Sequence, residues 1–384
     1  MSYLDRRFFA HNMHEACTWM RANEPVFRDS NGLLGVTRHA DIMAVSKDAT
    51  TFCSGRGFRP DAPIMPMMIN MDRPEHMVRR GLVNAGFTPR RVAEMEPRIR
   101  EICRGLVDSV QPRGECEFVR EVAARLPLIV IADLLGVREE DHDQLLEWSD
   151  ATMSAGGNPD PRAGARAAAA FTEYQDYCMA VVAERRRTGK TDDLMGMLVH
   201  AEIDGEKLDD PSLIFESLLI LNGGDETTRH VITGGMHQLL LHPGQRAALI
   251  ADPTGIPLAV EEMLRWVTPI ANMMRTATRS ARIDDFEVEE GDRLLLLYTS
   301  ANRDEAVFQD PFRFDVKRDP NPHVAFGGYG SHFCLGNALA RLELRVMFEE
   351  LLPRLPEIEL ASEDALPVRE SNFVVGIEQM QVRF

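Results

Sequence analysis

One long helical pattern constrains the fold more than any other feature of the chain. It is the stretch DDPSLIFESLLILNGGDETTRHVITGGMHQLLLHP. Asp210 is a suitable cap, Pro211 suits the first turn, and Pro243 ends a run of about thirty residues. That length exceeds the usual helix of a globular protein. We therefore expect a helix that crosses the core.

The middle of this predicted helix is unusual. Gly223 and Gly224 each cost about 1 kcal/mol relative to alanine in a helix interior, and they remove side chains from one face. Residues 225–228 follow them with two acids and two threonines. Threonine hydroxyls can bond to carbonyls of the preceding turn and open a helix locally. This pattern predicts a groove for a small molecule or water, with a kinked structural helix and a solvated acidic turn as the alternative.

Helical periodicity continues up to about Trp266. RPEHMVRRGLVNAGF begins with Pro74 in a first-turn position, where the missing N–H costs nothing. FVREVAARLPLIVIADLLG is expected to be a helix that Pro127 bends and Gly136 stops. We expect each of these segments to be helical.

Strand-like segments take over after Trp266. ARIDDFEVEEGDRLLLLYTSANRDEAVF alternates and contains a Gly-Asp turn, and the tail from Leu355 to Phe384 suggests further short strands. Without an internal repeat or a clear linker, the chain is expected to form one mostly helical domain, 1–384, with a small sheet. Its expected parts are a helix-rich region at about 70–266, β-richer regions at 1–70 and 267–330, a cysteine loop and helix at 325–353, and C-terminal strands at 355–384.

Composition limits the possible partners. The 384 residues are 44% apolar and 27% charged with a net charge of −17, as in a soluble globular protein. This argues against nucleic acid as a general partner, since phosphate binding needs a concentrated basic face. The N-terminus lacks a signal-peptide pattern and no apolar run approaches about 20 residues, so we expect a cytoplasmic protein without a membrane span.

The six cysteines form no CxxC pair and no disulfide-like framework, so five of them are most simply buried small hydrophobes. Cys334 differs because AFGGYGSHFCLGNALARLE places it among glycines directly before a helix-forming run.

Two helical pairs complete the pattern. Glu262 and Arg265 lie three apart in AVEEMLRW and can pair, although such pairs are common. His76 and Arg80 lie four apart in PEHMVRR and present two donors on one side of a helix, for which an exposed basic turn is the alternative.

Taken in order, RPEHMVRR, GGDETT, EEMLR, FQDPFRFDVKR and HVAFGGYGSHFCLGNALAR resemble the bacterial cytochrome P450 haem-thiolate monooxygenases over essentially the whole chain. The resemblance implies a mostly α fold with a small β portion, a triangular helical prism. It also implies a haem b between the long central helix and the cysteine-loop helix.

Cys334 would then be the axial thiolate and the metal ligand. Glycines around it let the backbone approach the porphyrin and aim amide groups at the sulfur, and the helix start favours a thiolate. Thiolate ligation in this family favours O–O cleavage. One departure is that Phe326 lies eight residues before Cys334, where the compact family motif has seven.

The resemblance implies roles for further residues. Those expected to contact haem are His76, Arg80, Gly223, Gly224, Arg275, His332, Cys334 and Gly336. Glu226 and Thr227 match the acid–alcohol pair that delivers protons. Glu262, Arg265 and Arg318 resemble a structural ion network that holds the cysteine-side loop.

Several segments look particularly similar to actinobacterial steroid side-chain hydroxylases, which oxidise the terminal carbon of cholesterol or cholestenone. The alternative substrates are fatty acids and other lipids or terpenoids. Apolar, methionine-rich segments suit a bulky hydrophobic guest. The candidate pocket residues are Met65, Met67, Met68, Leu219, Ile270, Met273, Phe373 and Val374.

Electrons must come from outside, because the chain has no flavin-binding or iron–sulfur pattern. The resemblance implies a ferredoxin with its reductase and NAD(P)H. A local basic dock for an acidic ferredoxin is expected from Arg73, Arg79, Arg90, Arg91 and Arg341, with ordinary exposed arginines as the alternative. A peroxide-driven peroxygenase and a haem-binding sensor or carrier remain as other functions, and neither explains Glu226 and Thr227.

Overall fold

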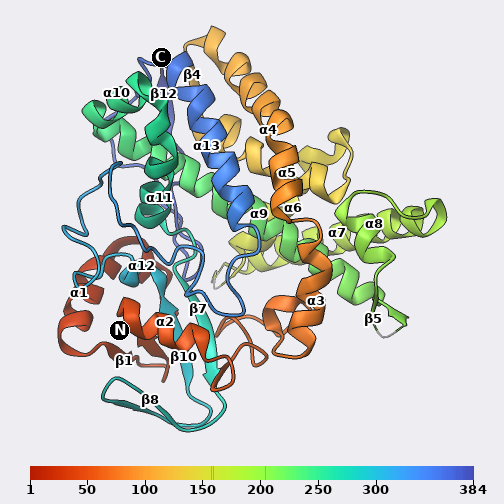
Figure 1. Cartoon of the computed structure of the whole chain (residues 1–384), viewed down its shortest axis with the longest axis vertical. Helices are drawn as coiled ribbons and strands as arrows, with labels where there is room; N and C mark the ends of the chain where they lie inside the picture. Colours follow the sequence, from red (N-terminus) through yellow and green to blue (C-terminus); the bar gives the residue numbers. More distant parts are fainter. Residues whose placement is uncertain (157, 159, 204) are drawn as a thin grey trace.

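A computed structural model describes residues 1–156, 158, 160–203 and 205–384. It is predominantly helical, as predicted, with helices gathered on one side and a small sheet near the N-terminus on the other (Figure 1). Within the part of the chain that the structure describes, no helix combines the length and apolar character needed to cross a membrane.

The central helix α9 spans Asp210–Leu241, 32 residues, and passes through the middle of the helical side (Figure 1). Its cap is Asp209 rather than the predicted Asp210, because the Asp209 side chain accepts a hydrogen bond from the Ser212 N–H at 2.9 Å. The helix also stays unbroken through its two glycines. The expected local opening is therefore absent from α9.

The other helices surround α9 and the sheet. Their bounds are α1 Met13–Asn23, α2 His39–Lys47, α3 Glu75–Asn84, α4 Pro89–Val110, α5 Arg125–Leu135, α6 His142–Ser154, α7 Pro161–Thr188, α8 Leu194–Val199, α10 Pro243–Ala251, α11 Ile256–Val267, α12 Tyr298–Ala301 and α13 Asn337–Arg354. Helix α4 packs along α13, while α5 and α11 both pack on α9.

The predicted helix after Phe118 is divided in two. A π-helical turn, η4 (Val119–Ala123), precedes α5, and the Ala124 N–H bonds to the Val119 carbonyl at 2.8 Å. Pro127 explains the division, because it has no N–H to offer the Ala123 carbonyl. Helix α5 ends at Gly136 as predicted, with φ at 73°.

The main sheet has the strand order β1-β2-β10-β7-β3. Strands β2 and β10 are parallel with Leu295 opposite Gly35, and the other neighbours are antiparallel. The bounds are β1 Val26–Arg28, β2 Leu34–Val36, β3 Phe52–Cys53, β7 Asn272–Ala277 and β10 Arg293–Leu297.

The remaining strands form smaller sheets, namely β8 Ala281–Ile283 with β9 Phe286–Val288, β11 Glu359–Leu360 and β4 Glu115–Glu117 on either side of β12 Gln381–Arg383, and β5 Glu202–Ile203 with β6 Glu206–Lys207. The region predicted as strands after residue 281 thus contains β8, β9 and β10, but it ends in α12. The tail is mostly irregular, with β11 and β12 as its named strands.

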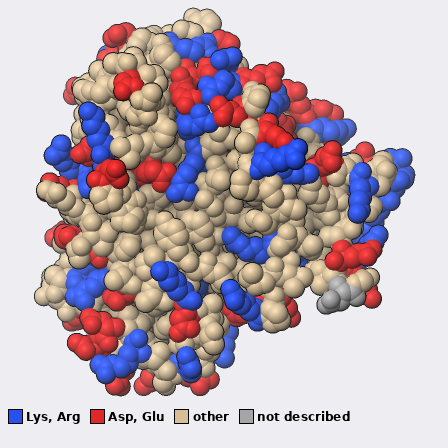
Figure 2. Space-filling view, viewed as in Figure 1, with Lys and Arg blue, Asp and Glu red and all other residues tan. Residues whose placement is uncertain are grey.

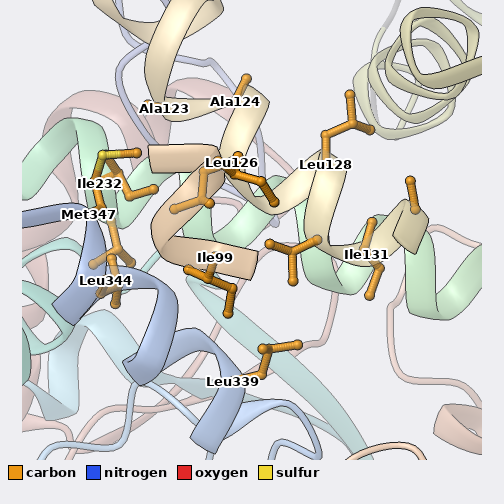
Figure 3. Close-up of a cluster of buried hydrophobic side chains, with 14 of the residues drawn as sticks. Ile99, Ala123, Ala124, Leu126, Leu128, Ile131, Ile232, Leu339, Leu344 and Met347 are labelled. Atoms are coloured by element: carbon orange, nitrogen blue, oxygen red, sulfur yellow. The ribbon is translucent and has the colours of Figure 1, made fainter. Parts of the chain in front are cut away.

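The largest hydrophobic core lies where α4, α5, α9 and α13 meet. Figure 3 shows Ile99, Ile131, Ile232 and Leu344, one from each of these helices, turned toward this shared interior. Burial of these apolar side chains is the main force that holds α9 against its neighbours. Helices α9 and α13 are thereby fixed relative to each other, which positions the segments described next.

Candidate functional site

The loop before α13 is held by its own backbone. The Cys334 N–H bonds to the Phe326 carbonyl at 3.0 Å, and the Phe333 N–H bonds to the Gly330 carbonyl at 3.0 Å. A Cβ on Gly330 would lie 1.8 Å from the Ser46 carbonyl oxygen of α2. Close packing against α2 therefore requires a glycine at this position.

Cys334 is the one cysteine of the six that is not buried. Burial of its sulfur still raises the pKa of the thiol, against the opposing effects of the Gly336 N–H, Arg80 and Arg341. A metal cation would reverse this balance, because a coordinating thiol is deprotonated outright. The N–H of Gly336 and the start of α13 lie where they would support such a thiolate.

Four groups that can carry positive charge gather beside this loop, as the resemblance implied. They are His76 and Arg80 on α3, Arg275 on β7 and His332 in the loop. The two imidazole rings stack with centroids 4.0 Å apart. Burial lowers the pKa of His76 to about 4, and burial with Arg275 lowers that of His332 to about 2.

This cluster lacks a protein counter-ion. In the described part of the chain, none of the four groups forms an ion pair. Among the residues that the structure describes, both ring nitrogens of the buried His76 are without a hydrogen-bond partner, and Arg275 donates only to the Met274 carbonyl at 2.7 Å. Such a cluster fits a ligand with two carboxylates, because Arg80 and Arg275 are cations that would be paired and the imidazoles can donate hydrogen bonds. The haem propionates meet that requirement.

The two glycines of α9 face different surroundings. A Cβ on Gly224 would lie 2.8 and 2.9 Å from Cδ1 and Cγ1 of Ile131 on α5. A Cβ on Gly223 would meet nothing within 4 Å, and this residue is exposed despite its place in the central helix. The Thr227 hydroxyl, four residues later on the same face, donates to the Gly223 carbonyl at 2.9 Å. Gly223 and Thr227 therefore share an open face of α9, while Gly224 serves helix packing.

Glu226 lies away from Thr227 in a buried ion cluster. Its carboxylate is fully buried and pairs with Arg229 at 2.9 Å and Arg369 at 2.6 Å. Burial raises the pKa of Glu226, and the two guanidinium groups oppose that rise. Among the described residues, no hydrogen bond joins this carboxylate to the Thr227 hydroxyl.

Sequence reasoning missed the two arginines that hold Glu226. Arg229 was detectable, because it lies three residues after Glu226 on the same helix. Arg369 comes from the C-terminal tail, 143 residues away, and carries no local signal. Each arginine also pairs with a partly exposed carboxylate, Asp150 for Arg229 and Glu378 for Arg369.

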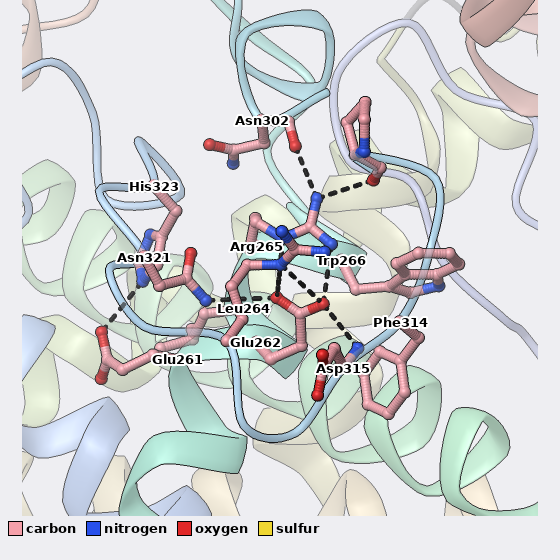
Figure 4. A network of polar contacts seen from close by, with 12 residues as sticks. Glu261, Glu262, Leu264, Arg265, Trp266, Asn302, Phe314, Asp315, Asn321 and His323 are labelled. Carbon is pink, nitrogen blue, oxygen red and sulfur yellow. Dashed lines mark hydrogen bonds and ion pairs between the residues drawn. The ribbon is translucent and has the colours of Figure 1, made fainter. Parts of the chain in front are cut away.

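The predicted ion network is assembled around the end of α11 (Figure 4). The fully buried Glu262 accepts from Arg265 at 2.7 Å through both carboxylate oxygens and from Arg318 at 3.1 Å. It also accepts from the Asp315 N–H at 2.9 Å, and Arg265 donates to the Asn302 carbonyl at 2.9 Å. The network joins α11 to the chain between α12 and the cysteine loop.

The candidate pocket segments lie together. Ile270 and Val374 form a β-bridge, and the Ala271 N–H bonds to the Phe373 carbonyl at 2.8 Å. The Met68 N–H bonds to the carboxylate of Glu216 on α9 at 2.8 Å, which ties the segment around residues 65–70 to the central helix.

The pocket candidates differ in burial. Met68, Phe373 and Val374 are buried. The half-buried candidates are Met65, Met67, Leu219, Ile270 and Met273. The half-buried side chains are thus the ones that retain accessible surface, and sequence patterns could not separate the two groups.

The five arginines of the predicted dock are not equivalent. Arg79 is only 13% exposed and pairs with the fully buried Glu216 at 3.3 Å, so it is unavailable as a surface cation. Arg341 pairs with Glu261 at 2.7 Å. Arg73 is exposed.

The last two dock candidates lie at the start of α4, where Arg90 pairs with Glu94 and Arg91 donates to the Asp192 carbonyl. Figure 2 shows the cysteine-loop face as a broad area without charged side chains, with Lys and Arg at its margin. The face is therefore less basic than the sequence suggested.

Known proteins share both the sequence and this arrangement. The Cytochrome P450 family model matches residues 256–384. A "Steroid C26-monooxygenase" of Mycolicibacterium smegmatis is 48% identical over 96% of this chain and 92% of its own length. A "Methyl-branched lipid omega-hydroxylase" of Mycobacterium bovis is 36% identical over 95% and 87%. The structure of Mycobacterium marinum cytochrome P450 CYP268A2 in complex with pseudoionone superposes with a TM-score of 0.92 at 35% identity, covering 99% of this chain and 97% of that one. The cysteine loop and the neighbouring cluster of His76, Arg80, Arg275 and His332 agree with these similarities over nearly the whole length. The chain belongs to the cytochrome P450 family.

Proposed function

We propose that this cytochrome P450 monooxygenase hydroxylates the terminal side-chain carbon of a sterol such as cholesterol or cholest-4-en-3-one. The observation that carries the substrate is the 48% identity, over 96% of the chain, with a protein named for steroid C26 oxidation. The half-buried methionines and aliphatic residues of the candidate pocket segments suit a bulky apolar guest.

Members of this family bind haem b through a cysteine thiolate, and Cys334 is the residue we assign to that role. His76, Arg80, Arg275 and His332 would pair with the propionates, which supplies the counter-ions that this buried cluster lacks. When bound, the haem supplies the oxidant that inserts one oxygen atom of O2 into a C–H bond. The protein contributes by fixing the sulfur, the propionates and the apolar guest relative to one another.

Thr227 and Glu226 are assigned to proton delivery. The Thr227 hydroxyl lies on the Gly223 face, and its donation to the Gly223 carbonyl leaves its oxygen able to accept a proton donor, such as water. Glu226 is buried one residue earlier, and this burial raises the pKa of its carboxyl group against the opposing effect of Arg229 and Arg369. Because the two side chains do not touch, transfer between them requires a bridging water or a rotation of Glu226 away from Arg369.

The electron donor is assigned to a ferredoxin with its NAD(P)H-dependent reductase. The cysteine-loop face offers an uncharged area with Lys and Arg at its margin, which suits an acidic partner. Arg73 is exposed on this side of α3, and Arg79 is excluded by its buried pair with Glu216. Reduction by an acidic ferredoxin should therefore slow as ionic strength rises.

A stepwise spectroscopic experiment tests the proposal. The reduced protein with carbon monoxide should show the red-shifted absorption of a thiolate-ligated haem, and cholest-4-en-3-one should convert the oxidised haem from low spin to high spin. Turnover with ferredoxin, reductase and NAD(P)H should yield the terminal alcohol, whereas turnover with peroxide alone would favour a peroxygenase. Absence of any product with either system would favour a sensor or carrier.

A second substrate class has its own support. The 36% identity with a methyl-branched lipid omega-hydroxylase favours branched lipids as the alternative. A spin shift with branched fatty acids and none with sterols would replace the sterol proposal with this one.

A further inference from the structure

The guanidinium of Arg59 lies at a junction of three chain segments. The side chain is only 10% exposed, and its Cζ lies 4.5 Å from the centre of the Phe373 ring. A Cβ on Gly156, after α6, would lie 2.7 Å from its Nη1. The guanidinium thus packs between its own loop, the C-terminal tail and the chain that follows α6.

Two of its three nitrogens are occupied. The Nε group donates to Asp61 at 3.1 Å, and Nη2 donates to Asp61 at 3.0 Å and to the Asn372 side-chain oxygen at 3.1 Å. Among the described residues, Nη1 has no hydrogen-bond partner. The two N–H donors of Nη1 on this half-buried guanidinium therefore remain available to a ligand.

Asp61 sets which acceptor suits Nη1. Its carboxylate accepts three hydrogen bonds from Nε and Nη2 of the guanidinium and is itself held by the Asn372 amide at 2.8 Å. The positive charge of Arg59 is therefore already neutralised by one carboxylate. A second carboxylate would bring an uncompensated negative charge next to Asp61, whereas a ketone or hydroxyl oxygen would not.

The segments around Arg59 are also those proposed to hold the substrate. Phe58 packs edge-on against Phe373 with ring centroids 5.8 Å apart, and its carbonyl accepts the Met274 N–H at 2.8 Å. The Asn272 side chain donates to the Asn372 carbonyl at 2.8 Å. The guanidinium contacts none of the residues assigned to haem in the described chain, so it belongs to a different part of the site.

We propose that Arg59 is a specificity-determining residue. Its Nη1 donates to a neutral oxygen on the end of the substrate opposite to the oxidised carbon, such as the C3 ketone of a steroid. Arg59 thereby orients an elongated apolar molecule with its other end toward the haem. This inference rests on the proposed sterol substrate.

A pair of ligands that differ in one oxygen provides the test. Cholest-4-en-3-one and cholest-4-ene, both delivered from cyclodextrin, are titrated into the haem-loaded enzyme, and the dissociation constant is read from the spin-state change. We expect the native enzyme to bind the ketone about tenfold more tightly, and Arg59→Gln to bring the two ligands to nearly equal affinity. Arg56→Gln is the matched control, since Arg56 is a nearby exposed arginine, and it should leave the tenfold preference unchanged.

The reciprocal variant separates ligand recognition from loop support. Asp61→Asn removes the counter-ion of Arg59, while the remaining amide oxygen can still accept from Nε and Nη2. It should improve the binding of hexadecanoate relative to hexadecan-1-ol by about tenfold, which a purely structural role would not produce. The native enzyme should show no such preference for the carboxylate.

The outcomes distinguish this inference from the proposed function. If sterols bind but Arg59→Gln keeps the native preference for the ketone, or weakens both sterols equally, Arg59 does not recognise the oxygen. If Arg59→Gln instead lowers the affinity for hexadecanoate alone, the residue serves a carboxylate and the proposal is wrong. If neither sterol binds the native enzyme, the sterol proposal itself fails and this inference fails with it.

Discussion

The adjacent glycines of α9 allow one substitution to be tested in two environments. Alanine should gain about 1 kcal/mol of helix propensity at either position. At Gly223 nothing lies within 4 Å of the added Cβ, so Gly223→Ala should raise the free energy of unfolding by up to about 1 kcal/mol. At Gly224 the Cβ would lie 2.8 Å from Ile131 Cδ1.

Overpacking of that kind costs about 1–3 kcal/mol, so Gly224→Ala should be less stable than Gly223→Ala by about that amount. Urea unfolding of the proteins prepared without haem, followed by far-UV circular dichroism, measures the difference, and equal m values would show that the comparison is valid. Ile131→Val deletes Cδ1 and should recover part of the loss in Gly224→Ala, because the two residues are in contact. Equal stabilities of the two alanine variants would refute the assignment of Gly224 to packing and Gly223 to the open face.

Three further predictions concern single side chains. Thr227→Ala should retain haem but divert electrons from NAD(P)H to peroxide, and unchanged coupling of electron use to product would remove this hydroxyl from the mechanism. Glu262→Gln should lower the free energy of unfolding, measured in urea, by about 3–5 kcal/mol, because Arg265 stays buried without its carboxylate partner. A decrease of less than about 1 kcal/mol would contradict a fold-supporting network. Burial, with a smaller effect of Asp225, raises the pKa of Glu343 to about 8, above its value near 4.3 in unfolded chains. The stability that its protonated form contributes is therefore full below about pH 4.3 and is lost as the pH rises to about 8. The free energy of unfolding of Glu343→Gln should thus increase relative to that of the native protein between these pH values. Parallel pH profiles of the two proteins would contradict this prediction.

The proton-delivery assignment changed most between sequence and structure. The motif alone predicted a neighbouring acid and alcohol that act together, but their side chains point to different surroundings. On a helix, consecutive residues lie about 100° apart, so adjacency along the chain does not bring two side chains together. Arg369, which pairs with the Glu226 carboxylate, comes from the C-terminal tail.

The basic dock shows the same limit. All five arginines were equivalent in the sequence, yet Arg79 pairs with the buried Glu216, whereas Arg73 is exposed. Arg73 precedes α3, whereas Arg79 lies on α3 and reaches Glu216 of α9. A charge pattern in one helix cannot reveal a carboxylate that is 137 residues away in another.

Local chemistry was sufficient for much of this protein. Proline near the start of α9, glycine at the end of α5 and the cysteine motif before α13 each act within a few residues, so the sequence alone determined these features and, through the ordered motifs, the family. Tertiary structure decided which glycine of α9 packs on α5 and that Arg369 pairs with Glu226. It also placed Arg59 beside Phe373. Those outcomes depend on contacts between segments far apart in the chain, and only the folded arrangement of helices and loops brings them within reach of one another.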